Sequence, residues 1–364
     1  MRIIGKLVFV FFISVSTGAF AATINITQPT TGNTNIDTAL ASALAAIETK
    51  LNTNYFSKIQ DQNEMARGFA NSNAATVHNA SLMGYQNYDL FAVMVGTQYA
   101  VSVPGYSMSK SADALKKTTT KGDTYVGFAQ SPVVANVGLN CKPLMDGLYL
   151  SLKFGGFNYS QTFNDIDVDY SQKTFGVGVN YSLLDGINIV AGLLRWRGFS
   201  FGTGVLYTQS DTKLTLSNIP DQTQSFTADS TTYSADVYDI KVKYNVKSNA
   251  VVVPLDLSTS IQALWILNVG VGAGADIVFP KSKITTGGDA KIGIKNYTGT
   301  IATPGTIDVI ASDTTNKPKA KDRFVPRLSA DIGLNFAVAK VDLNALLYPQ
   351  TKTAAIGLSL GVVW

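Results

Sequence analysis

The chain has 364 residues, of which 46% are apolar and only 15% are charged, and its formal net charge is +4 at pH 7. Such low charge excludes a largely disordered chain, and a single cysteine excludes an internal disulfide framework. After the first two dozen residues, no run approaches the roughly 20 apolar residues of a membrane-spanning helix. With 31 glycines, 16 tyrosines and 18 phenylalanines, the composition indicates an all-β protein, either soluble or embedded in a membrane.

The first 21 residues have the pattern of a removable secretory signal peptide. Arg2 and Lys6 precede an apolar run over 7–13, and the small residues Ala19 and Ala21 fit a cleavage site. Loss of these two basic residues would lower the net charge to +2, since 27 basic side chains would then face 25 acidic ones. A nearly neutral exported chain argues against a nucleic-acid partner, because phosphate binding needs clustered Lys and Arg.

Residues 22–87 are expected to be helical. Apolar residues recur at steps of three and four over 36–51, a second helix is expected over 55–67 with its end at Gly68, and a third over 71–83. The third helix is rich in small residues, which suits packing inside another structure. We therefore expect a plug or hatch, with a periplasmic helical domain as the alternative. The plug residues singled out are Met65, Arg67, Phe69, His78 and Met83.

From residue 88 to 364 the hydrophobic period changes to two, so each strand has one apolar face and one polar or glycine face. Soluble sandwiches share this pattern, but their strands average about five or six residues. Here many runs reach ten residues. The expected connections are also unequal in length, as in membrane barrels. The short ones lie near 140–146, 264–268 and 338–340, and the long polar ones at 104–122, 217–232 and 282–322.

The last alternating run ends on Trp364, and a C-terminal aromatic residue is typical of bacterial outer-membrane barrels. The predicted fold is an all-β, transmembrane, antiparallel up-and-down barrel of about 10–14 strands over 88–364, with an N-terminal helical plug. A charge facing hydrocarbon would cost about 2–4 kcal/mol, so charges within strands are expected to face the lumen. The expected channel-lining residues are Lys153, Asp239, Lys241, Lys243, Asp256, Asp276, Arg327 and Asp331.

Little in the sequence indicates catalysis. His78 is the sole histidine, and its neighbours Asn79 and Ser81 do not face it on a helix, which argues against a Ser–His–Asn phospholipase site. Asp165, Asp167 and Asp169 have oxygen ligands for a cation, but a solvated hairpin tip explains them better. We expect no enzyme activity, no cofactor and no metal.

The segment Glu64–Asn71 and the stretch Trp196–Gly204, together with the order plug then barrel, resemble a divergent, spirochaete-type member of the long-chain fatty-acid transporter family of outer-membrane proteins. The resemblance implies an N-terminal hatch in the lumen and sideways exit of apolar solutes through the wall. The chain departs from the family at Asn79-Ala80-Ser81, where the family's hatch ends in Asn-Pro-Ala. No ligand residue of the family is therefore carried over.

Two functions follow as hypotheses. The first is an outer-membrane channel for hydrophobic or amphipathic small molecules, with the lipid bilayer and a fatty-acid-like solute as its partners and 37–84 as the hatch. The second is a display barrel that binds ligands through the polar segments Thr118–Asp123, Ser217–Thr232 and Ile284–Asp322. A general porin is a third possibility, although it would need no plug. The oligomeric state stays open.

Overall fold

A computed structural model describes most of the chain. The described ranges are 23–53, 62–82, 88–104, 127–163, 166–190, 193–217, 219–299, 301, 305–310, 314–316 and 323–364. The predicted signal peptide and Met83 lie outside them, as do the polar segment 118–123 and Asp165. Among the helices in these ranges, none is long and apolar enough to cross a bilayer.

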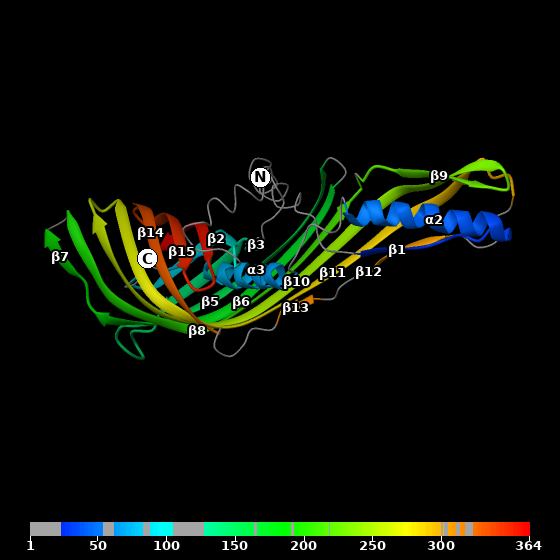
Figure 1. Ribbon diagram of the computed structural model, residues 1–364. Coiled ribbons are helices and arrows are strands. Elements are labelled where there is room, and N and C mark those ends of the chain that lie inside the picture. Colours follow the sequence, from blue (N-terminus) through cyan, green and yellow to red (C-terminus); the bar gives the residue numbers. More distant parts are fainter. Residues whose placement is uncertain are drawn as a thin grey trace.

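Ten long or medium strands of the described chain form a closed antiparallel ring (Figure 1). Neighbours in the ring are neighbours in sequence, and the ring closes where β16 pairs with β2. All strands thus have partners on both sides, which confirms an up-and-down barrel at the lower limit of the predicted strand number. In order, the strands are β2 (Phe91–Ser102), β4 (Val134–Asn140), β5 (Leu148–Phe163), β6 (Ile166–Leu184), β8 (Leu194–Leu216), β10 (Thr231–Ala263), β11 (Leu267–Lys295), β14 (Phe324–Phe336), β15 (Ala339–Tyr348) and β16 (Thr353–Val363).

The outer wall of the ring is apolar. Leu257, Ile332 and Leu360 are 45%, 49% and 55% exposed, and each lies on the outward phase of its strand. The inward phase of the same strands carries Ser258, Asp331 and other polar or glycine residues that are buried. A soluble monomer rarely exposes so much contiguous apolar surface. This wall forms a continuous belt around the ring.

The belt ends at one cross-strand row. Outward residues that face each other across neighbouring strands make up this row, and all are apolar or aromatic: Phe154, Phe175, Tyr207, Val251 and Phe279. The next outward row along the same strands is polar throughout: Gly156, Lys173, Gln209, Asn249 and Lys281. On β10 the belt therefore spans Val251–Ile261, close to the 9–11 residues of a tilted transmembrane strand.

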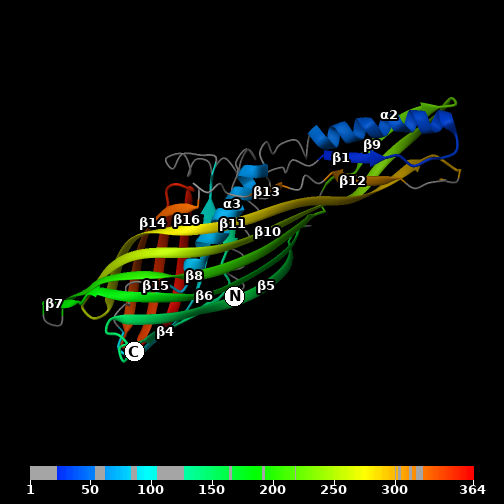
Figure 2. The same ribbon diagram turned by 90° about the horizontal axis from the view of Figure 1, so that it is seen from below.

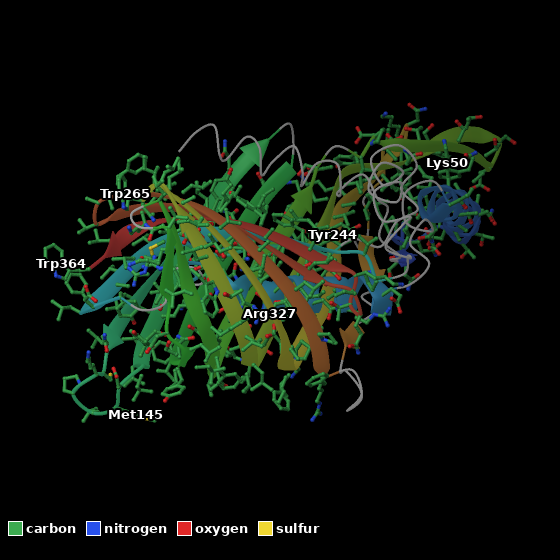
Figure 3. All side chains as sticks on the ribbon, turned by 90° about the vertical axis from the view of Figure 1, so that its left-hand side faces the viewer. Lys50, Met145, Tyr244, Trp265, Arg327 and Trp364 are labelled. Atoms are coloured by element: carbon green, nitrogen blue, oxygen red, sulfur yellow. The ribbon has the colours of Figure 1, made fainter. Side chains whose placement is uncertain are left out.

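The two ends of the ring differ. Short turns near 141–147, 264–266 and 337–338 lie at one end, together with Trp265 and Trp364 (Figure 3). At the other end β10 and β11 continue far beyond the belt and remain paired to Ser234 and Lys295 (Figure 2). We call this projecting part the extension. It also carries β9 (Gln222–Ala228) and a two-stranded sheet of β1 (Thr23–Thr27) and β12 (Thr306–Ile310).

Helix α2 (Thr34–Leu51) packs on the extension, outside the ring (Figures 1 and 2). Asn33 caps its first turn by accepting hydrogen bonds from two backbone amides. Its apolar stripe, with Leu40 and Leu44, is buried against the inward phase of the extended β10, which includes Val242 and Tyr244. The expectation that 37–84 forms one plug is therefore wrong for this helix. An apolar stripe needs an apolar partner, and this helix finds it in the buried cluster on β9 and the extended β10.

Helix α3 (Gln62–Ala75) continues through Gly68, where the sequence indicated a helix end. The reason for the glycine is a close contact instead. A Cβ atom at Gly68 would lie 2.7 Å from the backbone nitrogen of Gly127, in the short strand β3 (Gly127–Gln130). The glycine lets the helix approach the backbone of the barrel wall.

Several predicted connections also turn out to be strand. A single strand β10 runs over Thr231–Ala263, and β11 extends through 282–295, within the stretch expected as a long polar connection. The polar stretch 217–232 contains β9, which pairs with the first residues of β10. Polar composition indicated loops here because the extension stands outside the belt, where a strand needs no apolar outer face.

The belt gives a direct stability prediction. Leu257→Lys places a charge in mid-belt and is expected to lower the free energy of unfolding in phospholipid vesicles by about 2–4 kcal/mol. Asn249→Lys, one row outside the belt on the same strand, is the matched control and should change it little. Equal effects of the two substitutions in a denaturant titration would contradict the position of the belt edge.

Candidate functional site

The segment 62–82 threads the ring. Helix α3 contacts β2, β3, β8, β10, β11 and β16, and the chain continues through η2 (Thr76–His78) to Leu82 (Figure 1). Tyr88 then lies beside Tyr149 of β5, with ring centroids 4.8 Å apart, and Leu90 pairs with Trp364 at the short-turn end. A helix with side chains is about 10–12 Å wide, so small residues on α3 help it to fit the bore. We call 62–82 the plug.

Side-chain hydrogen bonds join residues 72–76 of the plug to the wall, at the level of the belt edge. Gln172 of β6 donates through Nε2 to Oδ1 of Asn73 at 3.2 Å and to Oγ1 of Thr76 at 2.9 Å. Thr208 of β8 also donates to Asn73, at 3.3 Å. Ser72 donates to the carbonyl of Gly127 in β3, at 2.8 Å. Three different strands thus hold one turn of helix.

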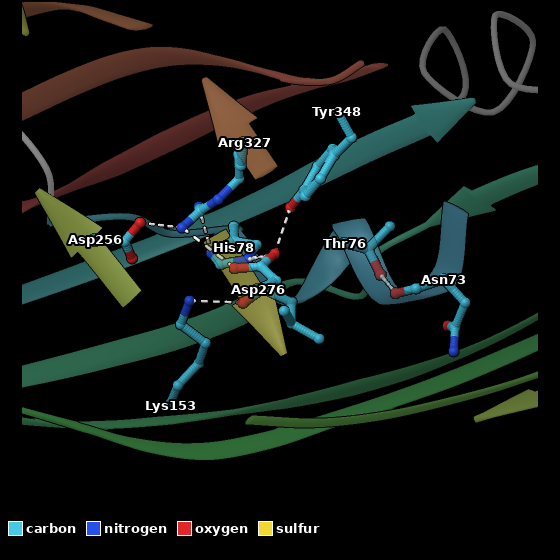
Figure 4. A network of polar contacts seen from close by, with 9 residues as sticks. Asn73, Thr76, His78, Lys153, Asp256, Asp276, Arg327 and Tyr348 are labelled. Carbon is cyan, nitrogen blue, oxygen red and sulfur yellow. Dashed lines mark hydrogen bonds and ion pairs between the residues drawn. The ribbon is translucent and has the colours of Figure 1, made fainter. Parts of the chain in front are cut away.

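A buried lysine closes the end of the plug helix. Nζ of Lys153, from β5, donates to the carbonyls of Val77 at 2.8 Å and Asn79 at 2.7 Å (Figure 4). The last carbonyls of a helix have no partner within the helix, and its C-terminal end carries partial negative charge. A cation is therefore the matching group at this position. Asn136 of β4 extends the contact by donating to the carbonyl of Ala80, at 2.9 Å.

Near its C-terminal end, the plug enters a network of charged residues centred on His78 (Figure 4). Arg327 of β14 donates to Nδ1 of the imidazole, at 2.8 Å. An arginine only donates, so Nδ1 must accept and Nε2 carries the proton, which it donates to Asp276 of β11 at 2.9 Å. Arg327 also pairs with Asp256 of β10, and Tyr348 of β15 donates to Asp276 at 3.0 Å. Two strands of the ring thus contact His78 directly, and two more join the network through Arg327 and Asp276.

The imidazole of His78 belongs to the plug rather than to a strand. A neutral imidazole fits the hydrogen-bond pattern, in which one ring nitrogen accepts and the other donates. The carboxylates of Asp256 and Asp276 then balance the positive charges of Arg327 and Lys153.

A cavity of about 120 Å³ lies beside this network. Polar lining groups come from His78, Lys153, Asp256 and Arg327, and apolar ones from side chains such as Leu82. A single water needs about 10–15 Å³ of such space, so the cavity has room for several of them.

The predicted channel-lining residues divide into two groups. Those within the belt lie on the inward phase and are at least partly buried: Lys153, Asp256, Asp276, Arg327 and Asp331. The other three, Asp239, Lys241 and Lys243, lie on the exposed outer face of the extension, where they form ion pairs with one another or with β11. Their predicted place in the lumen is therefore wrong. They lie outside the belt, where an outward charge meets water.

The predicted plug residues also have distinct positions. Phe69 and His78 are buried, whereas Arg67 is exposed and pairs with Glu64 on the same helix. Met65 lies in α3. The sequence reasoning missed Gln172, Thr208, Tyr348 and Asn136. Their signal was a polar side chain on the inward phase of a strand whose outward phase is apolar.

The barrel wall bends next to the plug. Pro132 lies between β3 and β4, and Ser131 makes two hydrogen bonds with the backbone of Gln98 on β2. Beyond this bend, β3 contacts the side chain of Tyr170 from β6, and no described strand pairs with β5 over 156–163 except β6. The edge of β5 is thus separated from β3 just outside the belt.

The fold and its lumen define a closed antiparallel β-barrel with an apolar outer belt and an internal plug. The chain belongs to the Lsa36-like family, whose model matches residues 19–364. No curated protein matches the chain. Within the described ranges, no group of three or more His, Cys, Asp or Glu side chains is placed to hold a metal ion.

Several solved outer-membrane proteins have some structural similarity to the chain. The translocator domain of the autotransporter NalP from Neisseria meningitidis has 8% identity and a TM-score of 0.29, over 76% of this chain and 90% of that one. A FadL homologue from Pseudomonas aeruginosa has 10% identity and a TM-score of 0.27, over 84% and 99%. CarO from Acinetobacter baumannii has 14% identity and a TM-score of 0.29, over 74% of this chain and 97% of that one. Scores this low carry no inference about function.

The lysine cap can be tested by substitution. Lys153→Met removes the donor from two buried carbonyls and is expected to lower the free energy of unfolding by about 1–3 kcal/mol. Amide hydrogen exchange over 72–80 should become faster. Lys243→Met, on the exposed extension, should change stability by about 1 kcal/mol or less. Unchanged exchange in the plug of the Lys153 variant would argue against the cap.

Proposed function

We propose that the protein is an outer-membrane channel for hydrophobic or amphipathic small molecules, and that the plug 62–82 is its hatch. The apolar belt supports insertion into a bilayer, because hydrocarbon offers backbone amides no water and only a closed sheet satisfies them. Each outward aliphatic side chain gains about 1.5–3 kcal/mol on leaving water. The extension would then project from the outer surface, as long loops of such barrels do.

The observation that carries this proposal is the polar attachment of the plug. Its contacts with the wall at Asn73, Thr76 and His78 are hydrogen bonds and ion pairs. A neutral hydrogen bond contributes only about 0.5–1.5 kcal/mol net when water is the alternative partner, and one to a charged group about 1.5–3 kcal/mol. The plug is also packed by apolar side chains, because Ala74, Ala75 and Val77 share a buried cluster with Leu206 and Val252 of the wall. The structure would therefore correspond to a closed state, and opening would have to break both kinds of contact.

Two features of the lumen bear on the passage of amphipathic molecules. The cavity beside the plug combines polar groups such as Ser151 and Asn180 with apolar groups of Leu82 and Leu206, which suits a small solute that has both a polar and an apolar part. Near Pro132, β3 does not pair with the edge of β5, and the buried side chain of Tyr170 bonds Gln130 there, so a sideways exit at this place would require Tyr170 to move. A solute larger than the cavity requires the plug to move.

Replacement of 62–82 by a Gly-Ser linker of equal length tests the hatch. Single-channel conductance in planar bilayers is expected to rise several-fold. Uptake of a labelled fatty acid by vesicles should no longer be limited by the plug. The same replacement of 34–51, which removes α2 from the extension, is the matched control and should leave conductance unchanged. Unchanged conductance without the plug would contradict the proposal, provided that the variant still shifts in gel mobility on heating.

The extension supports a second function, the binding of a ligand at the cell surface. It is a structured unit rather than a set of loops, because α2 buries its apolar stripe on β9 and β10 and Asn35 bonds Asp229 at 2.7 Å. No transport role requires such a unit. Here the replacement of 34–51 should abolish surface binding without any effect on conductance, and binding that survives it would exclude α2 from the ligand site.

A further inference from the structure

Four buried polar side chains surround Gly333 on the inner face of the ring. Asn268 of β11 and Asp342 of β15 lie directly opposite Gly333 in the two neighbouring strands, and Asp331 and Asn335 are the adjacent inward residues of β14 itself. Asn268 is 0% exposed, Asp342 1%, and the other two 4% each. Because glycine has no side chain, the space over Gly333 is left to these four groups. We call them the Gly333 cluster.

Most oxygens of the Gly333 cluster accept no hydrogen bond. The unpartnered ones are Oδ1 of Asn268, Asp331 and Asn335 and both carboxylate oxygens of Asp342. Within the cluster, Nδ2 of Asn268 donates to the remaining oxygen of Asp331, at 3.4 Å. Buried polar atoms normally have partners, and a buried charge without one is especially unfavourable. Five such oxygens around one glycine point to a shared ligand.

The basic residues of the neighbouring strands do not neutralise the two carboxylates. Arg327 is the sole basic residue of β14 and Lys340 that of β15, and β16 has none. Arg327 lies four residues from Asp331, toward the extension, and is held in the network of charged residues described above. Lys340 donates to the carbonyl of Ala337 at 2.9 Å, in the turn on the side away from Asp342.

Basic groups of the facing wall act elsewhere. Lys153 donates to carbonyls of the plug, and the charge of Arg197 acts on Lys340. In the part of the chain that the structure describes, the charged group that acts on Asp342 is Asp331, which has the same sign. The cluster therefore holds two like charges in a buried position, and a cation between them would remove their repulsion.

The chemistry of the cluster selects the kind of cation. Its ligands are all oxygens, from two carboxylates and two amides. Ca²⁺ takes about six to eight oxygens, including Asp carboxylates, Asn carbonyls and waters, at about 2.3–2.6 Å in a flexible geometry. Mg²⁺ requires a near-ideal octahedron and keeps several waters. Diagonal neighbours on paired strands, such as Asp331 and Asp342, lie about 7–8 Å apart, a gap that two carboxylates bridge through one ion.

We propose that the Gly333 cluster binds one divalent cation, and that Ca²⁺ fits it best. The ion neutralises both carboxylates and links three neighbouring strands, β11, β14 and β15, near the short-turn end of the ring. Two carboxylates are sufficient because amide oxygens and water complete the coordination. This inference goes beyond the proposed channel and does not depend on it, since it requires only the closed ring and its inward residues.

The test uses the full chain in detergent micelles after removal of divalent cations with EDTA. Isothermal titration calorimetry measures the binding of CaCl₂ and of MgCl₂. Circular dichroism then follows thermal unfolding in EDTA and in about 10 mM CaCl₂, a concentration above the dissociation constants typical of extracellular Ca²⁺ modules. Asp342→Asn and Asp331→Asn each remove one carboxylate and preserve its shape. Asp289→Asn, on the exposed extension, is the matched control.

The wild-type protein and the control should bind about one Ca²⁺ per chain and unfold at a higher temperature in CaCl₂, because a ligand of the folded state stabilises it. Each cluster variant should lose about tenfold or more in affinity and most of the thermal shift. In EDTA, Asp342→Asn should be at least as stable as the wild type, since it removes a buried like charge, and this also verifies its folding.

Three results would overturn the proposal. They are a wild-type chain that binds no Ca²⁺, binding that is unchanged in both cluster variants, and an Asp342→Asn variant that is less stable than the wild type in EDTA. The first would show that protons or water satisfy the carboxylates instead. None of these measurements involves transport, so they are independent of the conductance experiment.

Discussion

The structure depends on one constraint, the need of every backbone amide in the belt for a partner other than water. Ten strands meet it by closing into a ring, which leaves no edge within the apolar zone. Closure forces the polar phase of each strand inward, and the lumen then needs a polar filling. The plug provides polar groups at Asn73, Thr76 and His78. The wall side chains of Gln172, Lys153 and Arg327 donate hydrogen bonds to the plug. The filling and the wall are thus consequences of the same closure.

The position of the belt explains what the sequence could predict. Within the belt, period two and the phase of the charges were sufficient to place Asp276 and Arg327 inside. The same rule failed for Lys241 and Lys243 because it holds only where hydrocarbon covers the outer face. The signal was present, however. Along β10 the apolar phase changes from Val251 and its successors to Val242, Tyr244 and Val246, which face α2.

The site itself required three dimensions. His78 was recognised as unusual, but its partners come from strands 178 to 270 residues away in sequence, which no local pattern connects. Gly68 shows the same limit, since its role depends on the close approach of Gly127 in β3 and not on the helix that contains it. Local propensity identified helical stretches at 36–51 and in the plug, but it did not assign them to different places. The shape and side chains of the receiving surface decide this, since the large apolar stripe of α2 packs on the extension and the small residues of the plug pack in the lumen.

The most direct test is to measure how deep single outward side chains lie in a bilayer. Fluorophores are attached to Leu257→Cys and, separately, to Lys243→Cys, each in a Cys141→Ser background, and are quenched by brominated acyl chains or by aqueous iodide. The account predicts that the label at 257 is quenched by the lipid and protected from iodide, and that the label at 243 behaves in the opposite way. Iodide access to both positions would show that the ring does not lie in hydrocarbon and would contradict the central claim.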